Sequence, residues 1–258
     1  MTLRILSIGA GNVAFHLMQA LKASGNEIIQ VYSRKTSNAK SLADRLNCSY
    51  TNKASNLDLD CDLIIVSLPD QLIPNVVDKF KLKSFKGIIA HTSGSTASIN
   101  SNVKYSGVFY PLQTFNKTRD VVLSNVPFFI TGNNHRTKQT LRKLAKQISE
   151  RVYTISDEKR RELHLAAVIL NNFIHHLAYR SEEYLKSKKL KFEYLDELLK
   201  TGFEKILEKR LKSTQTGPAK RADLETIKTH KDMLESDIAL SQLYDSLTNS
   251  ILKTYGHK

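Results

Sequence analysis

A stripe of hydrogen-bonding side chains on one predicted helix offers the best candidates for proton transfer. His164, Asn171 and His175 stand at positions i, i+7 and i+11, so on a regular α-helix they fall within about 40° of one another. Asn172 is offset from this stripe by roughly 60–100°. An imidazole can donate a proton to a developing oxyanion or amine, and an amide can orient a carbonyl group. Hydrogen bonding between the helices of a core would explain the same stripe equally well.

A glycine turn near the start of the chain is typical of a dinucleotide site. The segment Leu3–Ala14 combines a short apolar strand, a glycine turn and the start of a helix. Gly9 permits a tight turn, Gly11 lets the backbone approach phosphates, and the small Ala14 allows close packing of helix and strand. The free N–H groups of a helix N-terminus attract an anion. We therefore predict that a cofactor pyrophosphate is held by Gly9, Ala10, Gly11, Asn12 and Val13.

The end of the second predicted strand, Ile28–Tyr32, indicates which dinucleotide binds. Sites specific for NAD place an acidic residue here, and this chain has Ser33 and Arg34 instead. A guanidinium and a hydroxyl group suit a 2′-phosphate, so NADP is favoured over NAD. No metal is predicted.

Polar or glycine-containing segments follow three further strands. Ligands of open parallel sheets lie outside the carboxyl ends of the strands, which places these segments at one edge. Leu68, Pro69, Ser93 and Gly94 are therefore predicted to contact the cofactor, and Gln113 the substrate. For Ser93 and Gly94 the alternative is a purely structural turn, and we expect the preceding His91 to be a structural histidine.

A loop in the second half of the chain offers groups for a carboxylate. Gly217 and Pro218 interrupt the helical pattern, and Asp223 is placed to cap the next helix. Arg221 can bind a carboxylate in two-pronged fashion. We predict substrate binding by Thr216, Gly217, Arg221 and Asp223, with a structural loop as the alternative.

The candidate residues lie in two halves of the chain that differ in their predicted secondary structure. Strands and helices alternate through residues 1–152, which predicts an α/β Rossmann domain with a doubly wound, mostly parallel sheet. Residues 153–258 are expected to form an all-α domain. Its predicted helices are Asp157–Lys186, Tyr194–Lys212, Leu224–Leu234 and Asp237–Thr254.

Composition excludes several classes of protein. The 258 residues are 41% hydrophobic and 25% charged, as in ordinary globular proteins. No apolar run is long enough to span a bilayer, and an immediate strand leaves no room for a signal peptide, so a cytoplasmic protein is expected. The net charge of +14 raises nucleic-acid binding as an alternative. No zinc-finger or RNA-binding pattern accompanies the charge, and solvated helix faces explain it better.

The motifs together resemble one family. They are Gly9–Ala14, His91–Ser95, Tyr110–Phe115, Asn171–Phe173 and the run from Thr216 to His230. They are similar to bacterial Rossmann-like proteins whose C-terminal half is the domain of unknown function 2520. The N-terminal half resembles deazaflavin-dependent NADP oxidoreductases and, more distantly, pyrroline-5-carboxylate reductases. The C-terminal half resembles the helical domain of 6-phosphogluconate dehydrogenase-like enzymes.

This resemblance implies an NADP-linked enzyme that dimerises through its helical domain. Some members of the group act as alternative ketopantoate reductases, so a short branched 2-oxo acid is a candidate substrate. The catalytic lysine pattern of standard ketopantoate reductases is not evident here, which favours His164, or a water held by Asn171 and His175, as the acid, with charge supplied by Lys220 or Arg221 as the alternative. We predict an NADP-dependent reductase of a small carboxylated carbonyl or imine compound. The alternative is a sensor or scaffold that binds NADP without turnover.

Overall fold

The computed structural model describes residues 2–99 and 103–257 and forms two compact units. The first extends to Leu170 and contains the sheet; the second begins at Asn171 and is helical. Helix α5 (Asp157–Ala167) therefore packs with the sheet unit. The division into functional domains near residue 152 stays a prediction, since a compact unit and a functional domain need not coincide.

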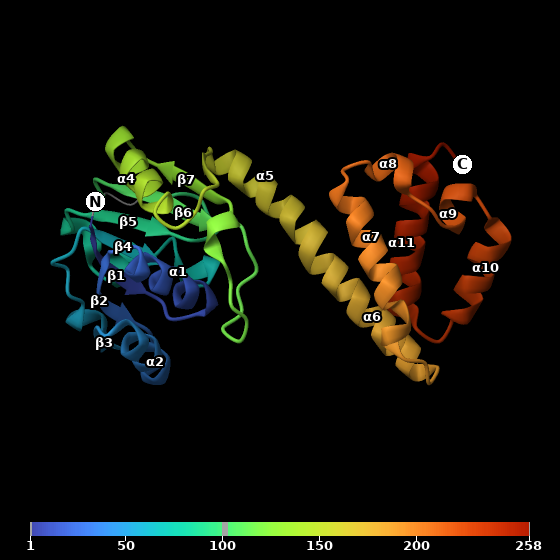
Figure 1. Cartoon of the computed structure of the whole chain (residues 1–258), viewed down its shortest axis with the longest axis horizontal. Coiled ribbons are helices and arrows are strands. Elements are labelled where there is room, and N and C mark those ends of the chain that lie inside the picture. The colour runs from blue at the N-terminus through green and yellow to red at the C-terminus, as the bar shows by residue number, and fades with distance from the viewer. Residues whose placement is uncertain (1, 100–102, 258) are drawn as a thin grey trace. The chain divides into compact units, whose positions relative to one another are not determined.

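An eight-stranded sheet forms the centre of the first unit (Figure 1). Its strand order is β3-β2-β1-β4-β5-β6-β7-β8, and every neighbouring pair is parallel except β6 and β7. The predicted doubly wound, mostly parallel sheet is confirmed. The strands are Arg4–Ile8 (β1), Glu27–Tyr32 (β2), Ser49–Thr51 (β3), Leu63–Val66 (β4), Ile88–His91 (β5), Ser106–Pro111 (β6), Phe128–Gly132 (β7) and Val152–Thr154 (β8).

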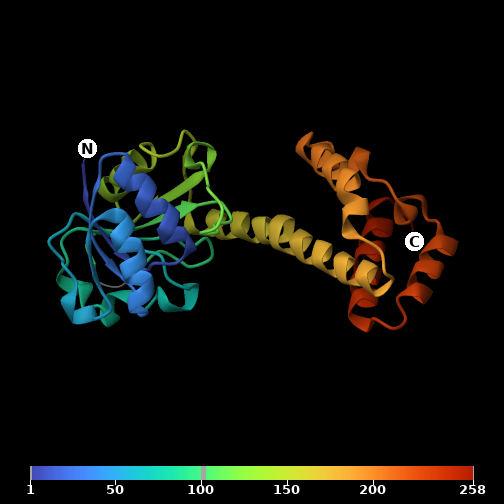
Figure 2. The same cartoon turned by 60° about the horizontal axis from the view of Figure 1, so that its bottom comes forward.

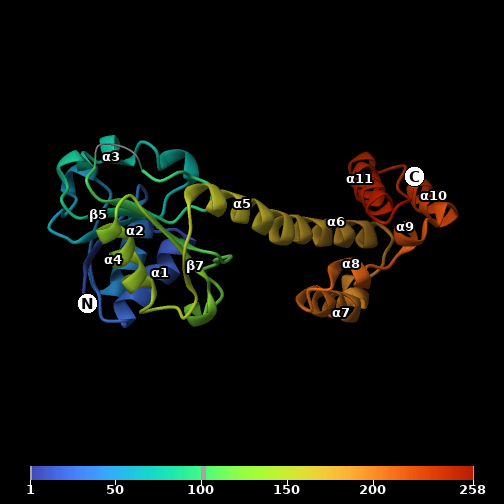
Figure 3. The ribbon, with the colours of Figure 1, turned by 90° about the horizontal axis from the view of Figure 1, so that it is seen from above.

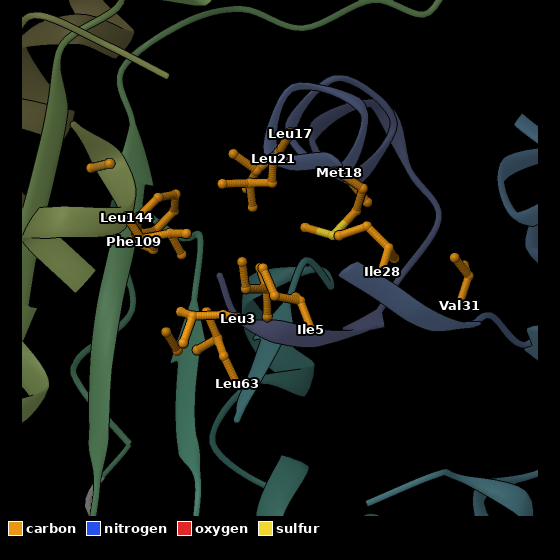
Figure 4. Packing of buried hydrophobic residues seen from close by; sticks show 14 of the residues in the cluster. Leu3, Ile5, Leu17, Met18, Leu21, Ile28, Val31, Leu63, Phe109 and Leu144 are labelled. Atoms are coloured by element: carbon orange, nitrogen blue, oxygen red, sulfur yellow. The ribbon is translucent and has the colours of Figure 1, made fainter. Parts of the chain in front are cut away.

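Helices cover both faces of this sheet (Figure 2). On one face lie α1 (Asn12–Ala23), α2 (Thr36–Leu46) and α4 (His135–Ala145). Figure 4 shows Leu17 and Leu21 of α1 directed toward the side chains of the central strands, where they are fully buried. Burial of such side chains stabilises the fold by about 1.5–3 kcal/mol each. This packing holds the N-terminus of α1 rigidly beside the glycine turn.

The opposite face carries less helix than the sequence predicts. The sequence between the end of β4 and Phe80 has a helical pattern, but the chain forms only a 3-10 turn, Asp70–Leu72, and a four-residue α3, Val76–Lys79. Pro74 explains the difference, because proline lacks an N–H and restricts the residue before it. Val76 and Val77 still cover the sheet through a second apolar cluster.

The helical part follows the sequence pattern with two interruptions. The predicted helix Asp157–Lys186 is α5 and α6 (Ile174–Ser187), separated by a π-helical segment, Val168–Phe173. The predicted helix Tyr194–Lys212 is broken at Lys209, whose φ of 60° ends the α-helical run. Figure 3 shows α9, α10 and α11 gathered beside one another. The remaining helices are Asp196–Leu207 (α7), Leu211–Thr214 (α8), Pro218–Arg221 (α9), Leu224–Met233 (α10) and Ile238–Thr254 (α11).

Within residues 2–99 and 103–257, no helix combines the length and the apolar character needed to cross a bilayer.

Candidate active site

The candidate site lies at the edge of the sheet where β1, β2, β4, β5 and β6 end, which we call the carboxyl edge. These five strands are parallel, so the residues that follow them share this edge. The predicted cofactor segments all follow such strands. Their placement at one edge agrees with the way open α/β sheets bind nucleotides.

The glycine turn after β1 has the tight geometry that its sequence predicts. Gly9 has a φ of 123°, and a Cβ there would overlap the carbonyl oxygen of Ser67. Its N–H donates to the Tyr32 carbonyl at 2.9 Å, which ties the turn to β2. Ala14 is fully buried where α1 meets the sheet. Only glycine permits both the positive φ of position 9 and its close approach to the Ser67 carbonyl oxygen.

The backbone beside this turn is open to solvent at Gly11. Gly11 is exposed, and a Cβ on it would meet no atom within 4 Å. The first N–H groups of α1 follow directly at Asn12 and Val13. Beyond β2, the Arg34 side chain is exposed and Ser33 is half-buried. Open backbone, unpaired helix N–H groups and a cation are the features that a phosphorylated dinucleotide needs.

A backbone hydrogen bond joins the segment after β5 to the end of β4. Thr92 N–H donates to the Val66 carbonyl at 3.1 Å. The Ser93 hydroxyl accepts hydrogen bonds from the N–H groups of Ser95 and Thr96 at 3.2 and 3.0 Å, so it stabilises its own turn. The structural alternative for Ser93 is thus observed. Cofactor contacts by Leu68, Pro69, Ser93 and Gly94 stay predictions.

His91 is a structural histidine. It is fully buried, its Nδ1 accepts from the Ser93 N–H at 3.2 Å, and its Nε2 lies 3.1 Å from the Ala97 carbonyl oxygen. This pattern requires the neutral tautomer with hydrogen on Nε2. Burial, followed by the nearby Arg160 charge, lowers the pKa of His91 to about 4.

The lowered pKa of His91 predicts a loss of stability in mild acid. Between pH 6.5 and pH 4 the unfolded imidazole binds a proton that the folded one rejects, so the free energy of unfolding falls as the pH falls. The loss from pH 7 to pH 4 is roughly 3 kcal/mol. Urea denaturation at several pH values measures it. The variant His91→Asn should show a flatter dependence, and an equally steep one would contradict the assignment.

A tyrosine and a histidine meet at the carboxyl edge. The Tyr110 hydroxyl, at the end of β6, lies 3.0 Å from Nδ1 of His164 in α5. A Cβ on Gly94 would be 2.5 Å from that Nδ1 and 2.6 Å from Cζ of Tyr110. The space that Gly94 leaves is therefore occupied by these two rings. The glycine is required here for side-chain packing, whatever its role toward a ligand.

A buried arginine holds the segment after β5 against α5. The Arg160 side chain is fully buried. Its guanidinium donates to Asp157 at 2.5 Å, to the Gly94 carbonyl at 3.3 Å and also to the Thr96 carbonyl. Asp157 in turn accepts from the N–H and hydroxyl of Ser98 at 2.6 and 2.8 Å. This network positions Gly94, and with it the Tyr110–His164 pair.

The other predicted catalytic residues belong to the helical unit. Asn171, Asn172 and His175 are exposed. The common face predicted for His164, Asn171 and His175 assumed a regular α-helix, and the π-helical segment Val168–Phe173 breaks that regularity. The angular argument therefore does not hold across this segment. The roles of these three residues stay predictions.

The predicted substrate loop has the local structure that its sequence indicates. Asp223 caps α10, accepting from the N–H and hydroxyl of Thr226 at 3.1 and 2.9 Å. The Arg221 side chain is 64% exposed and lies 4.0 Å from Asp223. Gly217 has a φ of 107°, and Thr216 is exposed. Gln113, in the sheet unit, is exposed as well. Substrate binding by these residues stays a prediction.

Sequence reasoning placed Tyr110 in a family motif without giving it a role in the site, and it did not single out Arg160. Tyr110 could have been found, because it ends a strand at the same edge as Gly9 and His91. Arg160 stands between Lys159 and Arg161, and nothing in the sequence distinguishes it from these exposed neighbours. Its burial follows from tertiary packing alone.

Comparison with protein families matches both halves of the chain. Residues 4–94 match the family described as coenzyme F420-dependent NADP oxidoreductase. Residues 126–251 match the domain of unknown function 2520. No curated protein matches the chain.

Solved structures extend the likeness to nearly the whole chain. A candidate NADP oxidoreductase from Bacteroides fragilis is 37% identical, with a TM-score of 0.88 and 98% of each chain covered. Protein TM1727 from Thermotoga maritima is 23% identical, with a TM-score of 0.79 and coverage of 98% and 99%. The 1-pyrroline-5-carboxylate reductase of Streptococcus pyogenes shares the fold at 16% identity, a TM-score of 0.58 and 98% coverage of each chain.

The 37% identity to the Bacteroides fragilis protein over nearly the full length of both chains establishes the family of this chain. It agrees with the glycine turn, the parallel sheet and the helical second unit. The chain therefore belongs to the family of NADP oxidoreductase-type proteins in which a Rossmann-like nucleotide-binding part is followed by a domain 2520.

Proposed function

We propose that this protein is an NADP-dependent reductase of a small carboxylated carbonyl or imine compound. The observation that carries the proposal is the Tyr110–His164 pair beside Gly94 at the carboxyl edge. A proton donor is needed at this edge, because reduction of a carbonyl or imine leaves an oxyanion or an amine nitrogen to be protonated.

His164 is the proposed proton donor, and Tyr110 positions it. Burial raises the pKa of Tyr110 to about 12, so the phenol keeps its proton at neutral pH. Its hydroxyl can donate to an unprotonated Nδ1 and accept from a protonated one. The ring is therefore held in both protonation states of His164, and Nε2 is left to carry the proton toward the substrate.

The bound nicotinamide supplies the hydride in this reaction. The glycine turn is proposed to bind and orient the cofactor, and the exposed Arg34 and half-buried Ser33 after β2 suit a 2′-phosphate. This arrangement supports NADP over NAD.

A carboxylated substrate is supported by the exposed Arg221 guanidinium, which suits two-pronged carboxylate recognition. Asn171 and Asn172 are proposed to orient the reacting carbonyl or imine, with His175 assisting through a held water. The pyrroline-carboxylate reductase neighbour acts on a compound that carries a carboxylate, and a ketopantoate-like 2-oxo acid is the candidate that the domain 2520 resemblance supports.

Turnover distinguishes this proposal from a non-catalytic sensor. Purified protein should oxidise NADPH, followed at 340 nm, when offered a panel of short 2-oxo acids and cyclic imino acids. Tight NADPH binding without oxidation across the panel would favour the sensor and refute the reductase.

The helical unit is proposed to form a homodimer. Among residues 171–257 only Ala219, Ile227, Leu234 and Thr248 are buried, whereas Leu198, Leu207 and Ile238 are 69%, 77% and 72% exposed. A unit that buries so few side chains and exposes several large apolar ones would be stabilised by covering them against a second copy. Sedimentation equilibrium should give twice the chain mass of 29.2 kDa. A monomer at micromolar concentration would contradict the dimer.

A further inference from the structure

The segment that follows β6 is docked on the first helix beside the glycine turn. Its Phe115 ring packs against the ring of His16 in α1 at a centroid distance of 5.5 Å. Nε2 of His16 lies 2.9 Å from the Asn116 carbonyl oxygen. The Asn116 side chain accepts from the N–H and hydroxyl of Thr118 at 3.0 and 2.9 Å. The segment thus has a defined turn and a defined anchor.

This docked turn presents the ammonium group of Lys117 to the glycine turn. Lys117 Nζ donates to the Ala10 carbonyl oxygen at 2.9 Å and lies 5.7 Å from the centre of the Phe15 ring. The contact with the ring face is a favourable cation–π interaction. An ammonium has three donors, so the bond to Ala10 leaves two for a ligand.

The position of this ammonium matches one part of a dinucleotide. Ala10 directly precedes Gly11, beside which a Cβ would meet no atom within 4 Å. The Cα atoms of Ala10 and Asn12 are at most about 7.6 Å apart, so Lys117 and the free N–H groups of α1 border the same space. Ser33 and Arg34 follow a different strand, β2. Because Lys117 is hydrogen-bonded to the glycine turn itself, the pyrophosphate is the anion that we expect it to meet.

We propose that Lys117 is a cofactor-binding residue whose ammonium contacts the pyrophosphate of the dinucleotide. The assignment rests on the proposed function, because it needs a dinucleotide on the glycine turn. It adds a side-chain cation to a site that otherwise binds the pyrophosphate through backbone N–H groups. A pyrophosphate is common to NADP⁺ and NAD⁺, so Lys117 should strengthen the binding of both.

Calorimetric titration with NADP⁺ and NAD⁺ tests the assignment. Lys117→Met should weaken the binding of both cofactors by the same factor, about tenfold or more. Lys117→Arg should retain most of the affinity. Arg34→Ala should weaken NADP⁺ and leave NAD⁺ unchanged. Lys86→Met is the matched control, because Lys86 precedes β5 at the opposite edge of the sheet and should change neither affinity.

The outcomes separate this inference from the proposed function. If the wild type binds both cofactors and Lys117→Met binds them equally well, with an unchanged melting temperature, Lys117 has no cofactor role. If Lys117→Met weakens the binding of NADP⁺ alone, the ammonium contacts the 2′-phosphate and the pyrophosphate assignment is wrong. If the wild type binds neither dinucleotide, the proposed function fails and the Lys117 assignment fails with it.

Discussion

Replacing His164 by glutamine should lower kcat by about 10²- to 10⁴-fold, the usual contribution of a positioned acid or base. The affinity for NADP⁺ should change far less than kcat, since His164 makes its hydrogen bond to Tyr110 and does not contact the glycine turn that is proposed to hold the pyrophosphate. Glutamine keeps a hydrogen-bonding group near the Tyr110 hydroxyl, so the packing around Gly94 is preserved. Single-turnover oxidation of NADPH with the substrate found in the panel measures the effect.

A second variant separates positioning from proton donation. Tyr110→Phe removes only the hydroxyl that holds Nδ1 of His164 at 3.0 Å. The imidazole stays in place as a proton donor with looser orientation, so kcat should fall by about tenfold, less than in His164→Gln. Tyr153→Phe is the matched control, because Tyr153 is 46% exposed in β8. Wild-type turnover in His164→Gln would remove this pair from the mechanism.

The sheet unit could be predicted from local sequence because its signals are local. Apolar runs such as Asp62–Ser67, separated by glycine turns and amphipathic helices, define parallel strands without knowledge of the rest of the chain. The prediction failed where one residue acted against the pattern. Pro74 shortened the helix after β4, and the left-handed backbone at Lys209 divided a predicted helix.

The candidate site could be predicted only in part. Gly9 could be predicted from its residue type, since only glycine tolerates its positive φ and its close approach to the Ser67 carbonyl. His164 was found by helical spacing, but the structure pairs it with Tyr110, which is 54 residues away in sequence. A spacing argument cannot find such a partner. The π-helical segment Val168–Phe173 likewise interrupts the regular α-helix, and no residue type within the segment predicts this interruption.

Replacing the buried Arg160 is expected to destabilise the protein strongly. Arg160→Met removes the cation from a fully buried site, takes a donor from the carbonyls of Gly94 and Thr96, and leaves Asp157 with only its hydrogen bonds from Ser98. Breaking a buried ion pair from one side costs about 3–5 kcal/mol, and Asp157, with 28% of its side chain exposed, places this case near the lower value. Urea denaturation of the free protein at pH 7 measures the loss.

The neighbouring residue provides the control for this loss. Arg161→Met removes the same charge from an exposed position on α5 and should change the free energy of unfolding by no more than about 0.5 kcal/mol. Burial alone raises the pKa of Asp157, but hydrogen bonds from the Ser98 N–H, Arg160 and the Ser98 hydroxyl hold it below its usual value. Arg160→Lys should restore little of the lost stability, because a lysine ammonium cannot reach all the acceptors that the planar guanidinium bridges. Equal stability of the Arg160→Met and Arg161→Met variants would show that the network does not hold Gly94. The Tyr110–His164 pair would then need another support, since Gly94 is where the network meets both rings.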